Sequence, residues 1–382
     1  MRQAMTPCKL LTATSCSYQT YRSTSFFNSL DGLRCLSILG VIWFHTAKGA
    51  GFAQSGALGV DQFFAISGFL ITTLLLREQE KWGRISLTAF YIRRTLRIFP
   101  LYYSMIALYI IVVWSLERTS FVGMQFFVNL PYFLTYTSNW FVHLDDRVIF
   151  YFAWSLATEE QFYLIWPTVE KFLRGWRSVG LIVALLIVRE FVEIALASGR
   201  VPSDNLWVVI LLSIHPAILG GVVMAHILHD QRTFAMISPV LGGRWAALLI
   251  FVGLVVALVL ALPLGYIWML MVLLVGSVVI RESNSLSPVL TWRPIAHVGI
   301  VSYGMYLMHM LSYHAVNEVL ITIGLNHEWL RFTTTAVVTT FAATISYRYY
   351  ESWFLRIKNR FARGQTHRPG VIVESGVQAD SA

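Results

Sequence analysis

Long apolar runs, separated by short polar or basic segments, make up most of the sequence. Each run is close to the length that an α-helix needs to cross the hydrocarbon core of a bilayer, which is about 20 residues. The pattern predicts an all-α integral membrane protein, folded as a bundle of about ten transmembrane helices. The ten runs lie near residues 33–50, 58–76, 99–116, 150–170, 178–197, 205–228, 245–262, 264–280, 295–323 and 332–355.

An eleventh apolar stretch, residues 126–143, is interrupted by Asn129, Pro131 and Asn139. Lysine and arginine gather on the cytoplasmic side of membrane proteins, so basic segments show which ends of the runs lie inside. If 126–143 stays outside or re-enters the membrane, every basic cluster is cytoplasmic and so are both termini. If it spans, the three central clusters fall outside, so we expect ten spans. The basic clusters are residues 77–97, 171–177, 232–244, 281–293 and 356–368.

Composition supports the membrane setting. Hydrophobic residues make up 56% of the chain and charged residues only 13%, about half the share typical of soluble domains. The net charge of +9 comes from clusters at the ends of apolar runs, so it indicates topology and not a nucleic-acid partner. We predict a multi-pass protein of the inner (cytoplasmic) membrane of a bacterium. Cys8, Cys16 and Cys35 have no histidine or acid at metal-ligand spacing, so no metal is expected.

The two ends differ from the rest of the chain. Residues 1–29 are rich in Ser, Thr and Tyr and lack the apolar core of a signal peptide, which predicts a disordered N-terminal tail. Residues 30–358 form one membrane domain, and 359–382 form a disordered C-terminal tail.

Arg34 and His45 lie within one apolar run, LRCLSILGVIWFHT. At 100° per residue, their separation places them within about 20° of the same helix face and roughly 16 Å apart. A cation and a titratable base inside a membrane helix are costly and indicate function. An imidazole titrates near a pKa of about 6.5, so His45 is the natural general base near neutral pH.

Three arginines precede the third run. Arg94 and Arg97 are three positions apart and Arg93 and Arg97 four, so a helix gathers two of their guanidinium groups on one face. Planar guanidinium groups suit phosphate oxygens. An anchor that orients the protein is the alternative reading of this cluster, but six basic residues among 77–97 exceed what orientation requires.

Several polar residues interrupt other runs. In FAWSLATEEQFYLIWP, Ser155, Glu159 and Tyr163 recur every four residues and form one polar stripe, next to Trp154. An intramembrane acid indicates function unless it only pairs with an arginine to join two helices. Asp61 opens the second run, and the ninth contains His309.

Six motifs together resemble acyltransferase family 3, the integral membrane acyltransferases that modify sugars, polysaccharides and some secondary metabolites. The resemblance extends from about residue 29 to 358. It implies a ten-helix bundle and transfer of an acyl group, usually acetyl, from acyl-CoA to a hydroxyl of a carbohydrate or related metabolite. The acceptor would be an exopolysaccharide, lipopolysaccharide or other glycan. The motifs are LDGLRCLSILGVIWFHT, GVDQFFAISGFLIT, RRTLRIFPLYY, WSLATEEQFYLIWP, YGMYLMHM and YRYYESWF.

The resemblance also implies roles by position. Arg34 and His45 match the family's arginine and histidine separated by ten residues, Arg94 and Arg97 match its paired arginines, and Glu159 matches the glutamate after Trp-Ser-Leu. The family's usual proline after Glu351 is replaced here by Trp353. Many relatives carry a C-terminal extracytoplasmic hydrolase-like domain that this sequence lacks, so we expect direct transfer or a separate extracytoplasmic partner.

The chemistry of thioester transfer assigns the residues as follows. A base deprotonates the acceptor hydroxyl, and positive charge stabilises the oxyanion. We expect His45 to be the base, Glu159 or Asp61 to orient it, and Arg34 to lie along the pantetheine path. Arg93, Arg94 and Arg97 would bind the phosphates of acetyl-CoA. Trp154, Ser155, Tyr163 and His309 would contact the substrate.

Two alternatives stay open on sequence alone. An acyl-histidine intermediate at His45 fits as well as direct attack by the acceptor. A secondary transporter or flippase could use Glu159, Asp61 and His45 as a relay, although the inverted repeats typical of transporters are not seen in the sequence.

Overall fold

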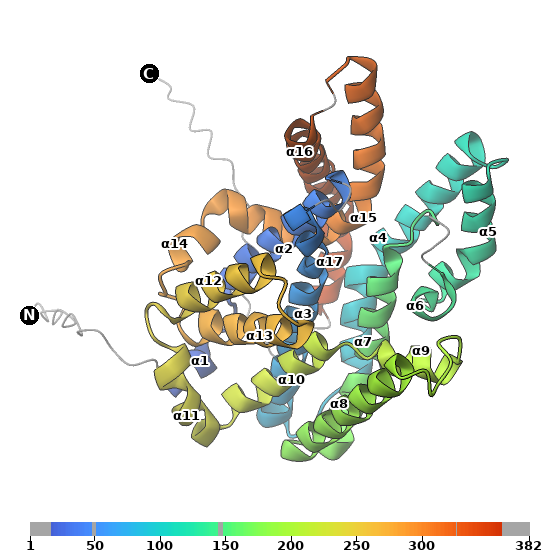
Figure 1. The fold of residues 1–382 in the computed structure, drawn as a ribbon. Coiled ribbons are helices and arrows are strands. Elements are labelled where there is room, and N and C mark those ends of the chain that lie inside the picture. The colour runs from blue at the N-terminus through green and yellow to red at the C-terminus, as the bar shows by residue number, and fades with distance from the viewer. Residues whose placement is uncertain (1–16, 48–50, 144–147, 326, 361–382) are drawn as a thin grey trace, which may run out of the picture.

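The computed structural model describes residues 17–47, 51–143, 148–325 and 327–360, which contain helices and no β-strand (Figure 1). The helices are α1 (Tyr18–Ser23), α2 (Asn28–Thr46), η1 (Gly51–Leu58), α3 (Gly59–Trp82), α4 (Leu87–Leu116), α5 (Phe121–Leu134), α6 (Ser138–Phe141), α7 (Ala153–Leu173), α8 (Trp176–Ala197), α9 (Leu206–Leu212), α10 (Pro216–His229), α11 (Gln231–Leu241), α12 (Ala246–Val259), α13 (Leu264–Ile280), α14 (Ser287–Leu290), α15 (Arg293–Thr322), α16 (Glu328–Ser346), the π-helical turn η3 (Tyr347–Glu351) and α17 (Ser352–Arg360).

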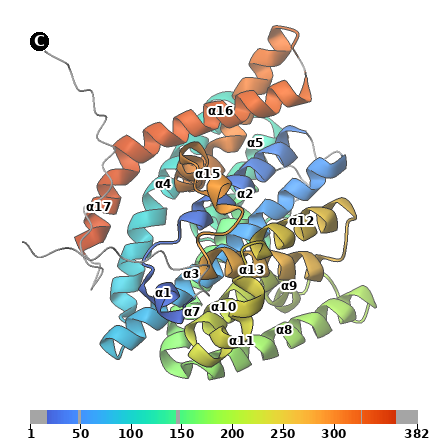
Figure 2. The same ribbon diagram turned by 90° about the vertical axis from the view of Figure 1, so that its left-hand side faces the viewer.

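Helices α2 and α3 lie at the centre of the molecule (Figures 1 and 2). Helix α3 packs most extensively against α10, and α2 against α15. Helices α13 and α7 contact α3 as well, while α16 contacts α2. The two helices that contain His45 and Asp61 are therefore enclosed by segments from across the chain.

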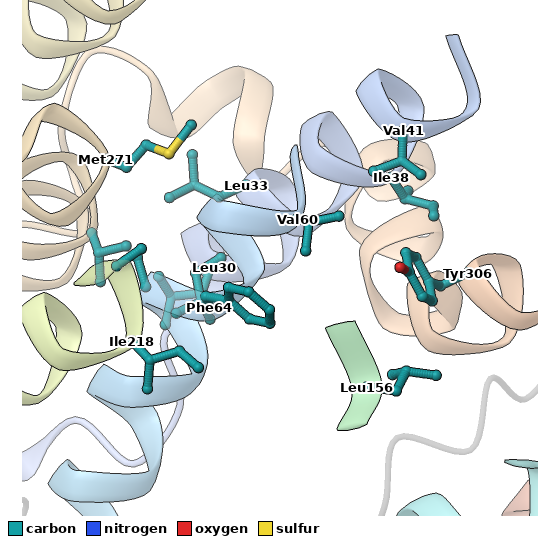
Figure 3. Packing of buried hydrophobic residues seen from close by; sticks show 14 of the residues in the cluster. Leu30, Leu33, Ile38, Val41, Val60, Phe64, Leu156, Ile218, Met271 and Tyr306 are labelled. Atoms are coloured by element: carbon teal, nitrogen blue, oxygen red, sulfur yellow. The ribbon is translucent and has the colours of Figure 1, made fainter. Parts of the chain in front are cut away.

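Buried apolar side chains fill the space between these central helices. Figure 3 shows Leu30 of α2 near Phe64 of α3, with Ile38 and Val41 further along α2 on the side of Tyr306 of α15. Leu30, Ile38, Val41 and Phe64 are each at most 2% exposed. This packing fixes the part of α2 that precedes His45.

Close backbone contact joins α3 to α10. A Cβ atom on Gly68 would lie 2.0 Å from the carbonyl oxygen of Ile218, and one on Gly221 would lie 2.2 Å from that of Ala65. Small residues allow this approach, as is common where membrane helices pack. Ser67, beside Gly68, is thereby held at a defined place in the bundle.

In the described residues each apolar run contains helix, but only some helices are long and apolar enough to cross a bilayer. By length and composition, Phe52–Trp82 and Leu87–Leu116 qualify in the described residues. The number rises to as many as four if each of two bent pairs counts as one span: α9 with α10, bent by 43°, and α11 with α12, bent by 71°. Ten spans with both termini in the cytoplasm therefore stay a prediction.

The interrupted stretch 126–143 does not form one long helix. Helix α5, with Pro131 inside it, ends at Leu134, and the short α6 follows. At the other end of the chain, Trp353 replaces the expected proline and the helix does not stop there. The π-helical turn Tyr347–Glu351 leads directly into α17.

Residues 17–29, which the sequence analysis assigned to an N-terminal tail, include helix α1 and the start of α2, and they pack on the bundle. Tyr21 is 3% exposed and its ring stacks on Phe234 and Phe27. Arg77 of α3 donates hydrogen bonds to the carbonyl oxygens of Thr24 and Tyr21. The aromatic residues of this segment have apolar partners on the bundle that its polar composition did not indicate. Residues 1–16 and 361–382 lie outside the described residues.

The contact at Gly68 predicts a loss of stability in Gly68→Ala. The added methyl group meets the Ile218 carbonyl, so we expect the free energy of unfolding to fall by about 1–3 kcal/mol, as for other overpacked sites. Thermal unfolding of the detergent-purified protein measures this. Gly180→Ala is the control, because a Cβ there has no neighbour within 4 Å among the described residues. Equal unfolding temperatures for the two variants would contradict the prediction.

Candidate active site

His45 lies near the C-terminal end of α2, and both ring nitrogens have partners. Nδ1 is 2.8 Å from the carbonyl oxygen of Val41, one turn earlier in the helix, and Nε2 is 2.6 Å from the hydroxyl of Tyr151. A carbonyl oxygen only accepts hydrogen bonds, so Nδ1 must carry the proton of the neutral ring. Nε2 then has a lone pair that accepts from Tyr151, and it is the atom available as a base.

A second histidine, His309 of α15, faces His45 at 4.9 Å between ring centroids. Its Nδ1 lies 2.5 Å from the carbonyl oxygen of Tyr306, which assigns the proton to Nδ1 here as well. Its Nε2 is buried and has no hydrogen-bond partner among the described residues. This lone pair is available to accept a hydrogen bond.

The turn that supplies Tyr151 is held by α7 and α15. Tyr306 donates from its hydroxyl to the carbonyl oxygen of Phe152 (3.0 Å), and Ser155 Oγ lies 2.5 Å from the Tyr306 hydroxyl. Phe150 adopts a positive φ of 70°, a conformation that costs energy for a bulky residue. Ser155 is thus engaged in fixing this turn beside His45.

Glu159 of α7 is surrounded by hydroxyl donors. Ser67 of α3 and Tyr163 of α7 both donate to its Oε1, and the Tyr163 hydroxyl is 3.1 Å from Ser67 Oγ. The guanidinium group of Arg94 lies over the Tyr163 ring, 4.6 Å from the centroid. Arg94 also interacts electrostatically with Glu159 and Glu160. The carboxylate is therefore compensated by two hydroxyl groups and one cation.

The predicted arginines have different partners. Arg34 pairs with Asp31 at 2.8 Å, and Asp31 also interacts electrostatically with Arg97. Arg97 interacts electrostatically with Arg94, and Arg94 in turn interacts with Glu159. Arg93 instead pairs with Glu78 at 3.2 Å and joins α4 to α3.

Asp61 lies in a separate polar cluster. Trp268 donates from its indole nitrogen to Oδ2 at 2.7 Å, and His215 Nε2 is 3.3 Å from Oδ1. Phe64 packs against His215 and against Trp154, with centroids 4.7 and 6.2 Å apart.

Neither acid that the sequence suggested as the orienting group for His45 has that position. The side chains of Glu159 and Asp61 have the partners described above, and the Val41 carbonyl fixes the His45 ring. The physical reason is local, because a helix places a carbonyl oxygen one turn behind every side chain. Tyr151 was missed because it comes from a turn with no periodic pattern, whereas Tyr306 and Ser67 were visible in motifs but had no assigned role.

No three His, Cys, Asp or Glu side chains within the described ranges are placed to hold a metal ion. No solved structure matches the chain.

Comparison with known proteins gives two informative relatives. The peptidoglycan O-acetyltransferase OatA of Listeria monocytogenes is 28% identical over 319 residues, which cover 76% of this chain and 50% of the relative. The O-acetyltransferase OatA of Staphylococcus aureus is 27% identical over 361 residues, covering 86% of this chain and 57% of the relative. The chain thus spans about half the length of these relatives. A sequence profile of the acyltransferase domain family matches residues 27–348. The chain therefore belongs to this family of membrane acyltransferases.

Proposed function

We propose that the protein is a membrane O-acetyltransferase that transfers an acetyl group from acetyl-CoA to a hydroxyl group of a cell-envelope carbohydrate. The observation that carries the proposal is the protonated Nδ1 of His45, held on the Val41 carbonyl, which leaves Nε2 as a base. Membership of the acyltransferase family supports the type of reaction. The two relatives, both named O-acetyltransferases, support acetyl as the group and, through the peptidoglycan in one name, a glycan as the acceptor.

In the proposed reaction the acceptor hydroxyl takes the place of the Tyr151 hydroxyl at Nε2 of His45. Its oxygen attacks the thioester carbonyl carbon while its proton moves to Nε2. The C–S bond then breaks, and the thiolate takes up the proton from the imidazolium. The Val41 carbonyl keeps its hydrogen bond to Nδ1 throughout and stabilises the transient positive charge, as an acid does in hydrolase triads.

His309 is suited to bind the acceptor. Its buried Nε2 can accept a hydrogen bond from a second sugar hydroxyl, next to the one that reacts at His45. Trp154 would supply an apolar surface nearby. The hydroxyl groups of Tyr163 and Ser155 already have partners, so they would shape the substrate site indirectly.

The donor would be bound by the arginines. Arg94 and Arg97 are electrostatically coupled and suit the phosphate groups of CoA, with Arg93 held beside them by Glu78. Arg34 lies on the same helix as His45 and would flank the pantetheine arm. The roles of Glu159 and Asp61 are then to position α7 and α3, and not to contact the acetyl group.

The first prediction concerns His45. Without the base, His45→Ala should lower transfer of label from radioactive acetyl-CoA to the membrane glycan fraction by about 10²–10⁴-fold. His314→Ala is the matched control, because His314 is on α15 with His309 but is exposed. Equal expression in the membrane must be verified for each variant. Full activity of His45→Ala would overturn the proposed role of His45 as the base.

A second prediction concerns the donor. Removing one guanidinium group in Arg94→Ala or Arg97→Ala should raise the KM for acetyl-CoA by about tenfold or more, since a charge-assisted hydrogen bond is lost. Steady-state kinetics at varied acetyl-CoA concentration measures this. Arg118→Ala, just beyond the C-terminal end of α4, should leave KM unchanged. An unaltered KM in both test variants would argue against CoA phosphates at this site.

A third prediction concerns the structural role of Glu159. Tyr163→Phe removes one of the two hydroxyl donors to the half-buried Glu159 carboxylate, so the free energy of unfolding should fall by about 1–3 kcal/mol. The loss should shrink when Glu159→Gln is present as well, because the two changes act on one interaction. Tyr91→Phe, whose hydroxyl bonds the Leu164 carbonyl at the surface, is the control. Additive effects in the double variant would refute the coupling.

A further inference from the structure

A hollow of about 540 Å³, lined by none of the residues of the candidate active site, lies between the bend that joins α11 to α12 and the segment that joins α13 to α14. Arg244 and Trp245 line one side. Arg281 and the hydroxyl-bearing Ser283, Ser285 and Ser287 line the other. No carboxylate is among the lining residues. Its walls therefore offer hydrogen-bond donors and positive charge.

Hydrogen bonds tie the two sides of the hollow together. Ser285 donates from both its backbone nitrogen (3.0 Å) and its hydroxyl (2.8 Å) to the carbonyl oxygen of Arg244. Arg281 donates through one nitrogen to the carbonyl oxygen of Gly242 at 3.3 Å. Asn284, 4% exposed, donates to the Arg281 carbonyl at 2.7 Å. The hollow is thus a fixed feature of the backbone.

The two arginines, Arg244 and Arg281, form no ion pair with an acid in the part of the chain that the structure describes. Each guanidinium group has five N–H donors, and the hydrogen bond of Arg281 to Gly242 uses only one of its five. Two such groups facing one hollow favour an anion with several oxygen atoms, above all a phosphate group.

The surroundings point to a lipid. Trp245 is 58% exposed at the rim, and the helix that starts after it, α12, exposes Leu249, Val252, Val256 and Val259 along one side. An apolar side with arginine and tryptophan at its end is the arrangement found where a helix leaves the hydrocarbon core. Both basic segments that form the hollow are also predicted to be cytoplasmic, where the membrane surface is anionic.

We propose that this hollow binds the phosphate group of an anionic phospholipid at the membrane surface, with Arg244 and Arg281 on the phosphate and Trp245 beside the acyl chains. The site is separate from the proposed acetyl transfer and does not depend on it.

The test uses the full chain in nanodiscs of phosphatidylcholine with a fixed fraction of phosphatidylglycerol, followed by native mass spectrometry of the lipids that stay bound. Arg244→Glu is the main variant, because the Arg244 side chain is exposed and the change should leave the fold intact. Retained phosphatidylglycerol should fall by about fivefold or more, and by about 25-fold in Arg244→Ala with Arg281→Ala, as expected for basic residues at an anionic surface. Arg293→Glu, an exposed arginine at the start of α15 that does not line the hollow, should retain it.

Three outcomes decide the proposal. Selective loss of phosphatidylglycerol in the Arg244 variants, with phosphatidylcholine unchanged, supports it. Equal retention in wild type and all variants overturns it. If phosphatidylglycerol is retained while binding of added coenzyme A or inorganic phosphate is lost in the Arg244 variants, the hollow takes a soluble phosphate compound and the lipid assignment is wrong.

Discussion

Direct backbone contact holds α2 between its neighbours, and the arrangement of the active site depends on it. A Cβ atom on Gly59 would lie 2.4 Å from the carbonyl oxygen of Ser37, and one on Gly299 would lie 1.9 Å from that of Asp31. Helices that touch in this way cannot slide past one another without a clash. The contact at Gly299 sets the register of α15 against α2, and this register brings His309 to His45.

Within this tightly packed bundle, hydrogen bonding separates the groups whose partners lie inside the protein from the groups that we propose to react or to bind substrate. Glu159 has two hydroxyl donors and a nearby cation, and Asp61 has an indole and an imidazole. A buried polar group without such partners is costly in an apolar environment. Two imidazole nitrogens differ from these groups. Nε2 of His45 accepts a hydrogen bond from Tyr151, which we propose that the substrate displaces, and Nε2 of His309 has no partner among the described residues. Substrate binding would satisfy both.

The sequence correctly predicted positions that depend on a single helix. Arg34 and His45 are on one continuous helix, as the apolar run between them predicted, because helical periodicity is a local property. The sequence did not predict positions that depend on contacts between helices. No pattern in the sequence places Tyr151 against His45, directs Asp61 to His215 and Trp268, or packs Tyr21 on Phe234. The break between α9 and α10 falls inside the run 205–228, which the sequence predicted as one span, whereas the bend between α11 and α12 coincides with the end of the basic segment 232–244.

The most direct test of the account is a structure of the full chain with a non-hydrolysable acetyl-CoA analogue bound. The account predicts that the carbonyl carbon of the analogue lies beside Nε2 of His45, with the pantetheine arm along α2 and the phosphate groups on Arg94 and Arg97. An analogue whose phosphate groups bind the hollow at Arg244 and Arg281, or whose carbonyl lies far from His45, would contradict it.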